Sequence, residues 1–276
     1  MSRISYLSRL YRYIRLFLIT GYFVFCTCAY TANIDERSGI TIQSTRVIYS
    51  GSETKGITFS VANDSVSPYL LQSRITPWAQ DLQTDYFEDE TKVVPFIVTP
   101  PLKRLESRES LALLIRLTQH SLPTDRESVF AFHIKAIPSQ PSNENQQGIS
   151  LPVISNEKTN ITVALKNTLK LFYRPEELPP YDAQKIAESL QFKRQNEQLV
   201  VTNPTAFYVT FDVLTIDGKN IKDDDLFFMT PPLSQQTYPI PSGTTRGDIS
   251  FQLLNDYGVK TNPVIRTLNN KNHNDE

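Results

Sequence analysis

The chain has 276 residues, which is long enough for one large domain or two domains of ordinary size. Its formal net charge is −1, but four of its 28 basic residues lie in the first fifteen positions, which leaves 24 basic against 29 acidic residues, or about −5, over the rest. This mildly acidic remainder gives no electrostatic reason to expect nucleic-acid binding.

The N-terminus has the layout of a secretory signal peptide. The arginine-rich start leads into a short apolar stretch over residues 16–29 that ends in small residues. The apolar run is shorter than the ~18–20 residues that a membrane span needs. We predict a signal peptide over residues 1–29, cleaved near Ala29, with an uncleaved N-terminal anchor as the alternative. Both cysteines, Cys26 and Cys28, lie in this leader, so the mature chain is expected to contain no disulfide and no cysteine metal site.

From Gly39 onward, apolar and polar residues alternate in short runs that are broken by turn residues. Such runs cover residues 57–61, 110–117, 130–136 and 207–213, and in the last of them Phe207, Val209, Phe211 and Val213 are expected to share one face. Short strands at this spacing predict β-sandwiches rather than alternating strands and helices. The only helix predicted is a short one over Ala183–Leu190.

Two segments divide the chain on a larger scale. Residues 138–148 are polar and rich in turn formers, which predicts a loop. Residues 174–182 are proline-rich and stiff, as expected of a linker between domains. The predicted organisation is a first domain over 37–176, a second over 183–265 and a polar tail over 266–276.

The order of several short motifs resembles the PapD-like periplasmic chaperones of pilus and fimbria assembly. The matching segments are 45–49 (TRVIY), 95–101 (PFIVTPP), 122–128 (LPTDRES), 169–175 (LKLFYRP), 203–205 (NPT) and 255–258 (NDYG). The resemblance implies two immunoglobulin-like β-sandwiches set at an angle with a cleft between them. It also implies a periplasmic chaperone that works without ATP or a cofactor, binds pilus subunits and delivers them to an outer-membrane usher.

The segment after the polar loop is the candidate subunit-binding strand. Ile161, Val163 and Leu165 fall on one side of an alternating run. Taken alone, an alternating run of this kind is more often an ordinary half-buried strand. In the family it is an edge strand lent to a subunit whose own sandwich lacks one strand, which is a form of β-augmentation.

Arg46 and Lys170 match the two basic residues with which the family holds the C-terminal carboxylate of the subunit. A guanidinium and an ammonium group form charge-assisted hydrogen bonds to such a group. The alternatives are a surface arginine and a solvated edge lysine that discourages aggregation. Lys170 has opposite parity to Leu165, so either a bulge intervenes or the site receives Lys170 from the second face of the strand.

Glu127, Arg174 and Asp256 match a charged set that the family places between its domains. An arginine that bridges two carboxylates would fix the geometry there. The alternative is three unrelated surface charges.

Two features leave the family subclass open. The long interval between residues 138 and 161 resembles the subclass with long loops, but His133 and Thr168 occupy the positions where that subclass usually has a cysteine pair. The Asp-Arg-Glu-Ser motif at 125–128 and the absence of cysteines resemble the short-loop subclass instead.

No pattern in the sequence indicates catalysis. The three histidines have no metal-ligand spacing, none belongs to a nucleophile-elbow pattern, and nine glycines form no phosphate-binding loop. We therefore expect no enzyme, no metal and no cofactor. The remaining alternative is an exported adhesin or fibre subunit, against which the second domain and the strand at 169–175 argue.

Overall fold

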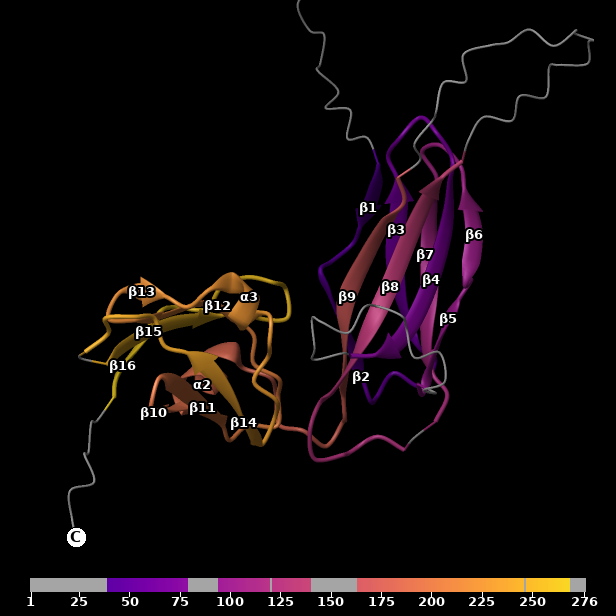
Figure 1. The fold of residues 1–276 in the computed structure, drawn as a ribbon. Coiled ribbons are helices and arrows are strands. Elements are labelled where there is room, and N and C mark those ends of the chain that lie inside the picture. Colours follow the sequence, from indigo (N-terminus) through magenta and orange to yellow (C-terminus); the bar gives the residue numbers. More distant parts are fainter. Residues whose placement is uncertain (1–38, 79–93, 120, 140–162, 246, 269–276) are drawn as a thin grey trace, which may run out of the picture. The chain divides into compact units, whose positions relative to one another are not determined.

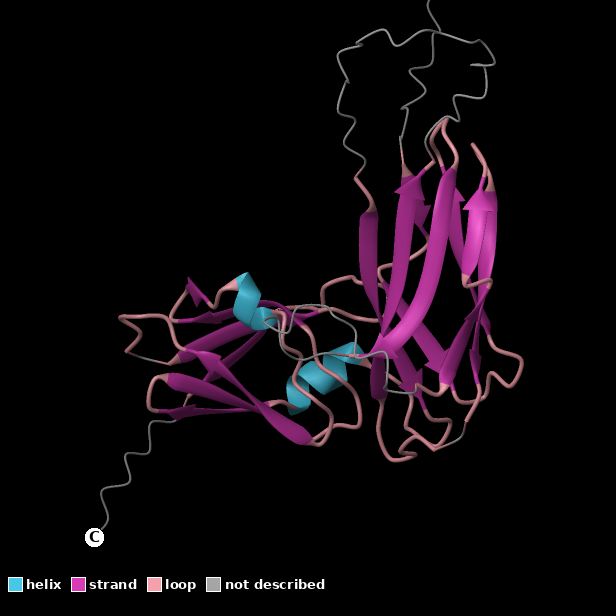
Figure 2. Ribbon diagram, turned by 45° about the vertical axis from the view of Figure 1, so that its right-hand side comes forward, coloured by secondary structure: helices cyan, strands magenta, loops and turns pink. Residues whose placement is uncertain are grey.

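The computed structural model describes residues 39–78, 94–119, 121–139, 163–245 and 247–268. Their regular structure is β-strand apart from two short helices, which confirms the predicted all-β class (Figure 2). The predicted signal peptide, Ile161 and nearly all of the polar loop lie outside the described residues. Within the described part of the chain, no helix is long and apolar enough to cross a bilayer.

Residues before the proline-rich linker form an immunoglobulin-like sandwich of two sheets (Figure 1). One sheet has the strand order β1-β3-β7-β5 and the other the order β2-β9-β8-β4-β6. The strands are β1 (Ile40–Ile42), β2 (Arg46–Ser50), β3 (Ile57–Asn63), β4 (Tyr69–Pro77), β5 (Phe96–Thr99), β6 (Leu102–Leu105), β7 (Ser110–Leu117), β8 (Ser128–Pro138) and β9 (Leu165–Arg174).

The apolar side chains of the alternating runs fill the space between these two sheets. Phe59 and Val61 of β3 and Phe132 and Ile134 of β8 are all buried in one core cluster. The rings of Phe59 and Phe132 meet edge to face with centroids 5.4 Å apart. The opposite faces of these strands, including that of β9, lie outside this core.

Residues after the linker form a second sandwich, with the strand orders β10-β11-β14 and β13-β12-β15-β16. Its elements are α2 (Ala183–Ser189), β10 (Gln191–Gln195), β11 (Gln198–Asn203), β12 (Phe211–Ile216), β13 (Lys219–Asn220), α3 (Asp223–Leu226), β14 (Ser234–Pro239), β15 (Asp248–Leu253) and β16 (Val264–Thr267). The predicted short helix is confirmed as α2, which begins at the N-cap Asp182. The second helix, α3, has no counterpart among the predictions.

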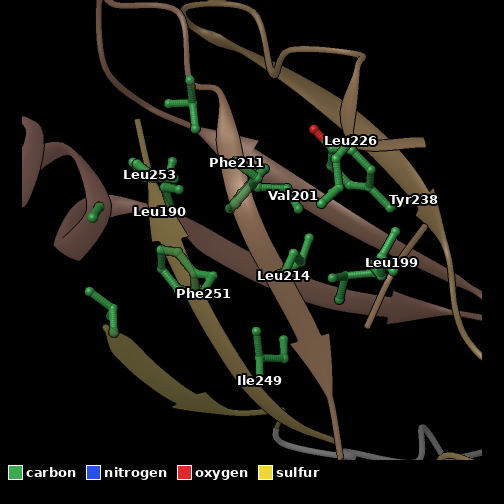
Figure 3. Close-up of a cluster of buried hydrophobic side chains, with 14 of the residues drawn as sticks. Leu190, Leu199, Val201, Phe211, Leu214, Leu226, Tyr238, Ile249, Phe251 and Leu253 are labelled. Carbon is green, nitrogen blue, oxygen red and sulfur yellow. The ribbon is translucent and has the colours of Figure 1, made fainter. Parts of the chain in front are cut away.

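The core of the second sandwich corrects one predicted strand face. Phe211 packs edge to face against Tyr238 and Phe251, as Figure 3 shows. The pairing of β12 with β15 shifts register between Phe211 and Val213, so Val213 leaves the buried row and Leu214 takes its place. A bulge of this kind adds one residue to a strand and inverts the alternation beyond it.

The C-terminal strand extends past the predicted domain end at residue 265. Strand β16 continues to Thr267, and Leu268 is buried in the core of the second sandwich. The backbone N–H of Leu268 also donates to the carbonyl of Gly247. The ordered second domain therefore includes the first residues of the predicted polar tail.

Candidate functional site

Arg46 and Lys170 lie side by side on neighbouring strands. Strand β2 pairs with β9 in parallel, and in their register Arg46 is directly opposite Lys170. Val47 of β2 and Leu171 of β9 are buried in the core of the first sandwich. Because side chains alternate along a strand, Arg46 and Lys170 both point away from that core.

The register of β9 answers the question of parity. From Leu165 to Tyr173 its pairing with β8 is continuous and shows no shift. Leu165 therefore lies on the same face as the buried Leu169 and Leu171, whereas Lys170 lies on the opposite face. The bulge considered from the sequence is absent from this stretch, and the second face of the strand carries the cations.

A third cation, Arg174, lies on the same face of β9 and is saturated by two carboxylates. Its Nε and Nη2 donate to Oε1 of Glu127 at 2.9 and 2.7 Å, and its Nη1 and Nη2 donate to Asp256 at 2.9 and 3.0 Å. The guanidinium also lies over the rings of Tyr181 and Phe207, at 4.4 and 5.2 Å from their centroids. Burial opposes the charge of Arg174, but the bonds to Asp256 and Glu127 outweigh it, so the pKa of Arg174 is raised.

The two carboxylates come from opposite sides of the linker. Glu127 precedes β8 in the first sandwich, and its remaining oxygen accepts the backbone N–H of Tyr208 in the second at 2.8 Å. The backbone N–H of Glu127 donates to the carbonyl of Ala206, also at 2.8 Å. These contacts, and the two rings over Arg174, are additional to the three charges found from the sequence. Every residue has the same backbone groups, so the sequence could not predict which backbone groups contact Glu127.

Asp256 is presented by a tight turn of the second sandwich. The side chain of Asn255 accepts the backbone N–H groups of Tyr257 and Val259 at 3.0 and 2.9 Å. Gly258 completes the turn with a φ of 72°, which a residue without a Cβ adopts readily. The motif at 255–258 thus encodes the geometry that directs Asp256 toward Arg174.

Arg46 and Lys170 differ from Arg174 because neither has a carboxylate partner. Among the described residues, no Asp or Glu oxygen lies within 4.0 Å of either cationic group. Burial, with a smaller contribution from the charge of Arg46, lowers the pKa of Lys170 to about 8. Burial also lowers the pKa of Arg46, although Tyr181, Asp256 and Glu127 act against that shift.

The contacts of these two cations are with rings and a backbone carbonyl. The guanidinium of Arg46 lies 5.9 Å from the ring centroid of Phe172, and its Nη1 donates to the carbonyl of Leu254 at 3.4 Å. The Nζ of Lys170 lies 5.3 Å from the ring of Trp78 and 5.8 Å from that of Phe227. Two partly buried cations that have no carboxylate partner among the described residues can accept an anion from outside the chain.

The two edges of β9 are covered to different extents by the described strands. Strand β8 pairs with β9 from Leu165 to Tyr173, whereas β2 pairs only with residues from Lys170 onward. Between Leu165 and Leu169, no other described strand covers the remaining edge. Val163 and Leu165 are 66% and 61% exposed at this end, so two apolar side chains lie outside the core here.

His133 and Thr168, predicted to occupy the cysteine positions of one subclass, are direct partners across β8 and β9. The Nδ1 of His133 hydrogen-bonds to the hydroxyl of Thr168 at 2.9 Å, and its Nε2 bonds to the hydroxyl of Thr76 at 2.8 Å. His133 is 5% exposed, and burial, followed by the charges of Lys166 and Arg74, lowers its pKa to about 4. A neutral histidine with both ring nitrogens satisfied therefore joins the two strands here.

No group of three or more His, Cys, Asp or Glu side chains in the described ranges is arranged to hold a metal ion. The charged residues that the structure brings together are arranged as ion pairs and as unpaired cations. Such an arrangement is chemically able to bind an anionic group.

Comparison with known proteins agrees with this geometry. Residues 39–179 match the sequence model described as "Pili and flagellar-assembly chaperone, PapD N-terminal domain". Residues 185–264 match the model described as "Pili assembly chaperone PapD, C-terminal domain". The chain belongs to the PapD-like pilus-assembly chaperones.

Individual relatives of this chain are also named as chaperone proteins. The chaperone protein FimC of Escherichia coli strain K12 is 32% identical over 228 residues, which are 81% of this chain and 82% of FimC. The chaperone protein LpfB of Salmonella typhimurium strain LT2 is 31% identical over 250 residues, 88% of this chain and 97% of LpfB.

Solved structures support the same fold. The SafB chaperone, solved in complex with the SafA pilin of Salmonella enterica, aligns with a TM-score of 0.66 at 29% identity, over 84% of this chain and 97% of that one. The Escherichia coli chaperone DraB also aligns with a TM-score of 0.66, at 28% identity, over 84% and 99%.

These relatives favour a chaperone over the adhesin or fibre subunit that the sequence left as an alternative. Chaperones of this family assist folding and assembly and are not enzymes. The family is periplasmic, and membership implies that location for this chain.

Proposed function

We propose that this chaperone captures pilus or fimbrial subunits by adding β9 to their incomplete sandwich while Arg46 and Lys170 bind the C-terminal carboxylate of the subunit. The observation that carries the proposal is the continuity of the two features. The half of β9 that no second described strand pairs with leads directly into Lys170, which is paired in register with Arg46 and has no carboxylate partner among the described residues. An edge for a strand and a site for a terminal anion are therefore adjacent on one element.

The geometry supports a defined direction for the client, meaning the captured subunit. If its last carboxylate lies at Lys170, the preceding residues extend along β9 toward Val163. The client strand then runs in the same direction as β9. Strand β2 begins at Arg46 on the same edge, so the client strand ends where β2 starts.

The energies are adequate for capture without ATP. Each large aliphatic side chain of the donor strand that enters the client core contributes roughly 1.5–3 kcal/mol. Each hydrogen bond to the carboxylate from a charged donor contributes about 1.5–3 kcal/mol. Ile161, outside the described residues, is proposed as a third donor side chain beside Val163 and Leu165. The client's own missing strand is later supplied by the next subunit, so the chaperone needs no nucleotide to release it.

We further propose the cellular course implied by the family. The leader over residues 1–29 directs export and is removed near Ala29, and the chaperone then delivers its client to an outer-membrane usher. We assign the first domain to residues 37–176 and the second to residues 183–268, which extends the predicted end at 265 to include β16 and Leu268. The ion network of Glu127, Arg174 and Asp256 is proposed to fix the junction between them.

The test is co-expression of the chain with a pilus subunit and recovery of a soluble 1:1 complex. Val163→Asp is expected to weaken capture about 10- to 150-fold, which corresponds to the loss of one buried aliphatic contact. Its melting temperature should stay unchanged because Val163 is largely exposed. Ile265→Asp is the matched control, since Ile265 is 70% exposed on β16 of the other sandwich.

The carboxylate half of the proposal is tested in the same assay. Lys170→Ala is expected to abolish recovery of the complex while leaving the chaperone folded, and Lys193→Ala, which removes an exposed lysine of β10, should have no effect. Capture by Lys170→Ala at the wild-type level would exclude Lys170 from the binding site. A large fall in the melting temperature of Val163→Asp would show that this residue belongs to the core of the chaperone itself.

A further inference from the structure

Trp78 and Phe227 enclose the ammonium group of Lys170 although they are far apart in the sequence. Trp78 directly follows β4 of the first sandwich, and Phe227 is the C-cap residue of α3 in the second. Their rings stack with centroids 5.8 Å apart and an interplanar angle of 26°. The Nζ of Lys170 lies 5.3 Å from the Trp78 ring and 5.8 Å from the Phe227 ring.

Neither ring is explained by the packing of a core. Both are half-buried, and neither Trp78 nor Phe227 belongs to the core cluster of its own sandwich. Their described ring contacts are with each other, with Lys170 and, for Phe227, with Phe228. The ammonium group of Lys170 is therefore a common neighbour of these two large apolar side chains.

The physical effect of this arrangement is to keep a charged group in place without an anion. The face of an aromatic ring attracts an ammonium ion, and the attraction is larger where water is excluded. The rings also remove water from Lys170, which makes a later contact with a carboxylate stronger than it would be in bulk solvent. A lysine in this setting is oriented before the client arrives.

The residues paired with Lys170 on the neighbouring strands do not stabilise its charge. Arg46 on β2 faces Lys170 and repels it, and Ala131, the partner of Lys170 on β8, carries no charge. The three aspartates of α3 (Asp223, Asp224 and Asp225) form no ion pair with Lys170 within 4.0 Å.

We propose that Trp78 and Phe227 are positioning residues for the carboxylate site, forming an aromatic clamp that holds the Lys170 ammonium dehydrated and oriented in the client-free chaperone. This inference rests on the proposed function for its biological meaning, but the clamp itself is a property of the free protein. Without one of the rings, Lys170 loses part of the attraction that orients its ammonium group and gains conformational freedom, which opposes binding of a carboxylate.

The clamp is tested first in the absence of a client. Trp78 is the only tryptophan in the chain, so its fluorescence reports directly on Lys170. The emission should change as the ammonium loses its proton, with a midpoint near pH 8. Burial raises the pKa values of Tyr181 and Tyr208, which keeps those phenols out of this range. Lys170→Met should abolish the transition, and a transition that persists in this variant would overturn the clamp.

The second test removes one ring. Phe227→Leu removes an aromatic face that stabilises the ammonium form but keeps an apolar neighbour, so the fluorescence midpoint should move to lower pH, further below the ordinary lysine value of 10.5. It should also weaken binding of a peptide with the client's C-terminal sequence about threefold to tenfold, within the range expected for one lost cation–π contact. Phe228→Leu is the matched control because it removes the neighbouring ring, which does not contact Lys170. Phe227→Tyr, which keeps an aromatic face, should restore both properties.

The two hypotheses fail in different ways. An unchanged midpoint and an unchanged affinity in a folded Phe227→Leu variant would overturn the clamp. The same peptide prepared as a C-terminal amide tests the anchor, because it lacks the carboxylate. Equal binding of the acid and the amide would overturn the carboxylate site, on which the clamp's role depends, whereas the fluorescence transition would still report the contact itself.

Discussion

Strand β9 carries two cationic sites on one face, and they are built in opposite ways. Arg174 receives two carboxylates and two aromatic rings from the chain itself. Four residues earlier, Lys170 has rings on one side, a second cation beside it and no carboxylate among the described residues. The comparison teaches that burial of a charge alone does not identify a binding site, because a charge whose partners are already present serves structure and one without them is available to a ligand.

The largest expected effect comes from breaking the saturated site. Arg174→Ala leaves Glu127, whose side chain is 2% exposed, as a buried carboxylate with its cationic partner removed. Removal of one partner from a buried ion pair typically costs about 3–5 kcal/mol, so the free energy of unfolding should fall by that amount. Denaturant unfolding measures it. A loss below about 1 kcal/mol would show that the network is dispensable for folding.

Capture of a client through Lys170 should instead depend on pH. Lys170 is charged below its pKa of about 8 and neutral above it, so client affinity is lost as the pH rises through that value. We expect the dissociation constant to increase about tenfold or more between pH 7.5 and 9.5, as titration of one essential ammonium group requires. Lys170→Arg should flatten the profile because a guanidinium stays protonated. A flat profile in the wild-type protein would contradict the role of Lys170.

His133 is a third buried ionisable group on the same sheet, and unlike Arg174 and Lys170 it is neutral at pH 7. Its pKa of about 4 in the folded state is below its ordinary value of 6.5. As the pH falls below 6.5, the unfolded state binds the proton first, so stability is lost between pH 6.5 and 4. The expected loss is about 1 kcal/mol at pH 5.5. His133→Gln, measured by thermal unfolding at pH 7.5 and 5.5, should lack this acid-sensitive component; an equal slope in both proteins would exclude His133 as its source.

The smallest effect is expected for Lys170→Met in the absence of a client. Because burial lowers the pKa of Lys170 below its ordinary value, the charged residue destabilises the folded state at pH values below about 8. Replacement should leave the free energy of unfolding unchanged or raise it by up to about 1 kcal/mol, opposite in sign to Arg174→Ala. A strong destabilisation would mean that the chain uses Lys170 for its own folding.

The sequence predicted many of the strands, but it did not predict the surroundings of the charged residues. Alternation identified β7 and β8, whereas Arg46, Lys170 and Arg174 were singled out by the resemblance of their short motifs to a known family. The face on which Lys170 lies depends on the pairing of β9 with β8, and register is a property of two strands rather than one.

Other features were missed for related reasons. Val213 was placed on the wrong face because a bulge leaves no simple mark in the composition of a strand. Trp78 and Phe227 meet only after two separate domains have folded, so no local pattern links them. Aromatic residues just outside a strand end and just after a short helix are ordinary when each is considered alone.

In the proposed function, the point at which β2 joins β9 would fix the position of every client relative to its last residue. A client strand that must stop at Lys170 offers its side chains to β9 at distances counted back from its C-terminus. One residue added to that terminus would turn every apolar side chain to the opposite face. Two added residues would restore the face but displace the strand by about 6–7 Å. Under this proposal, client tails of equal hydrophobicity would be distinguished by how many residues separate their apolar side chains from the C-terminus.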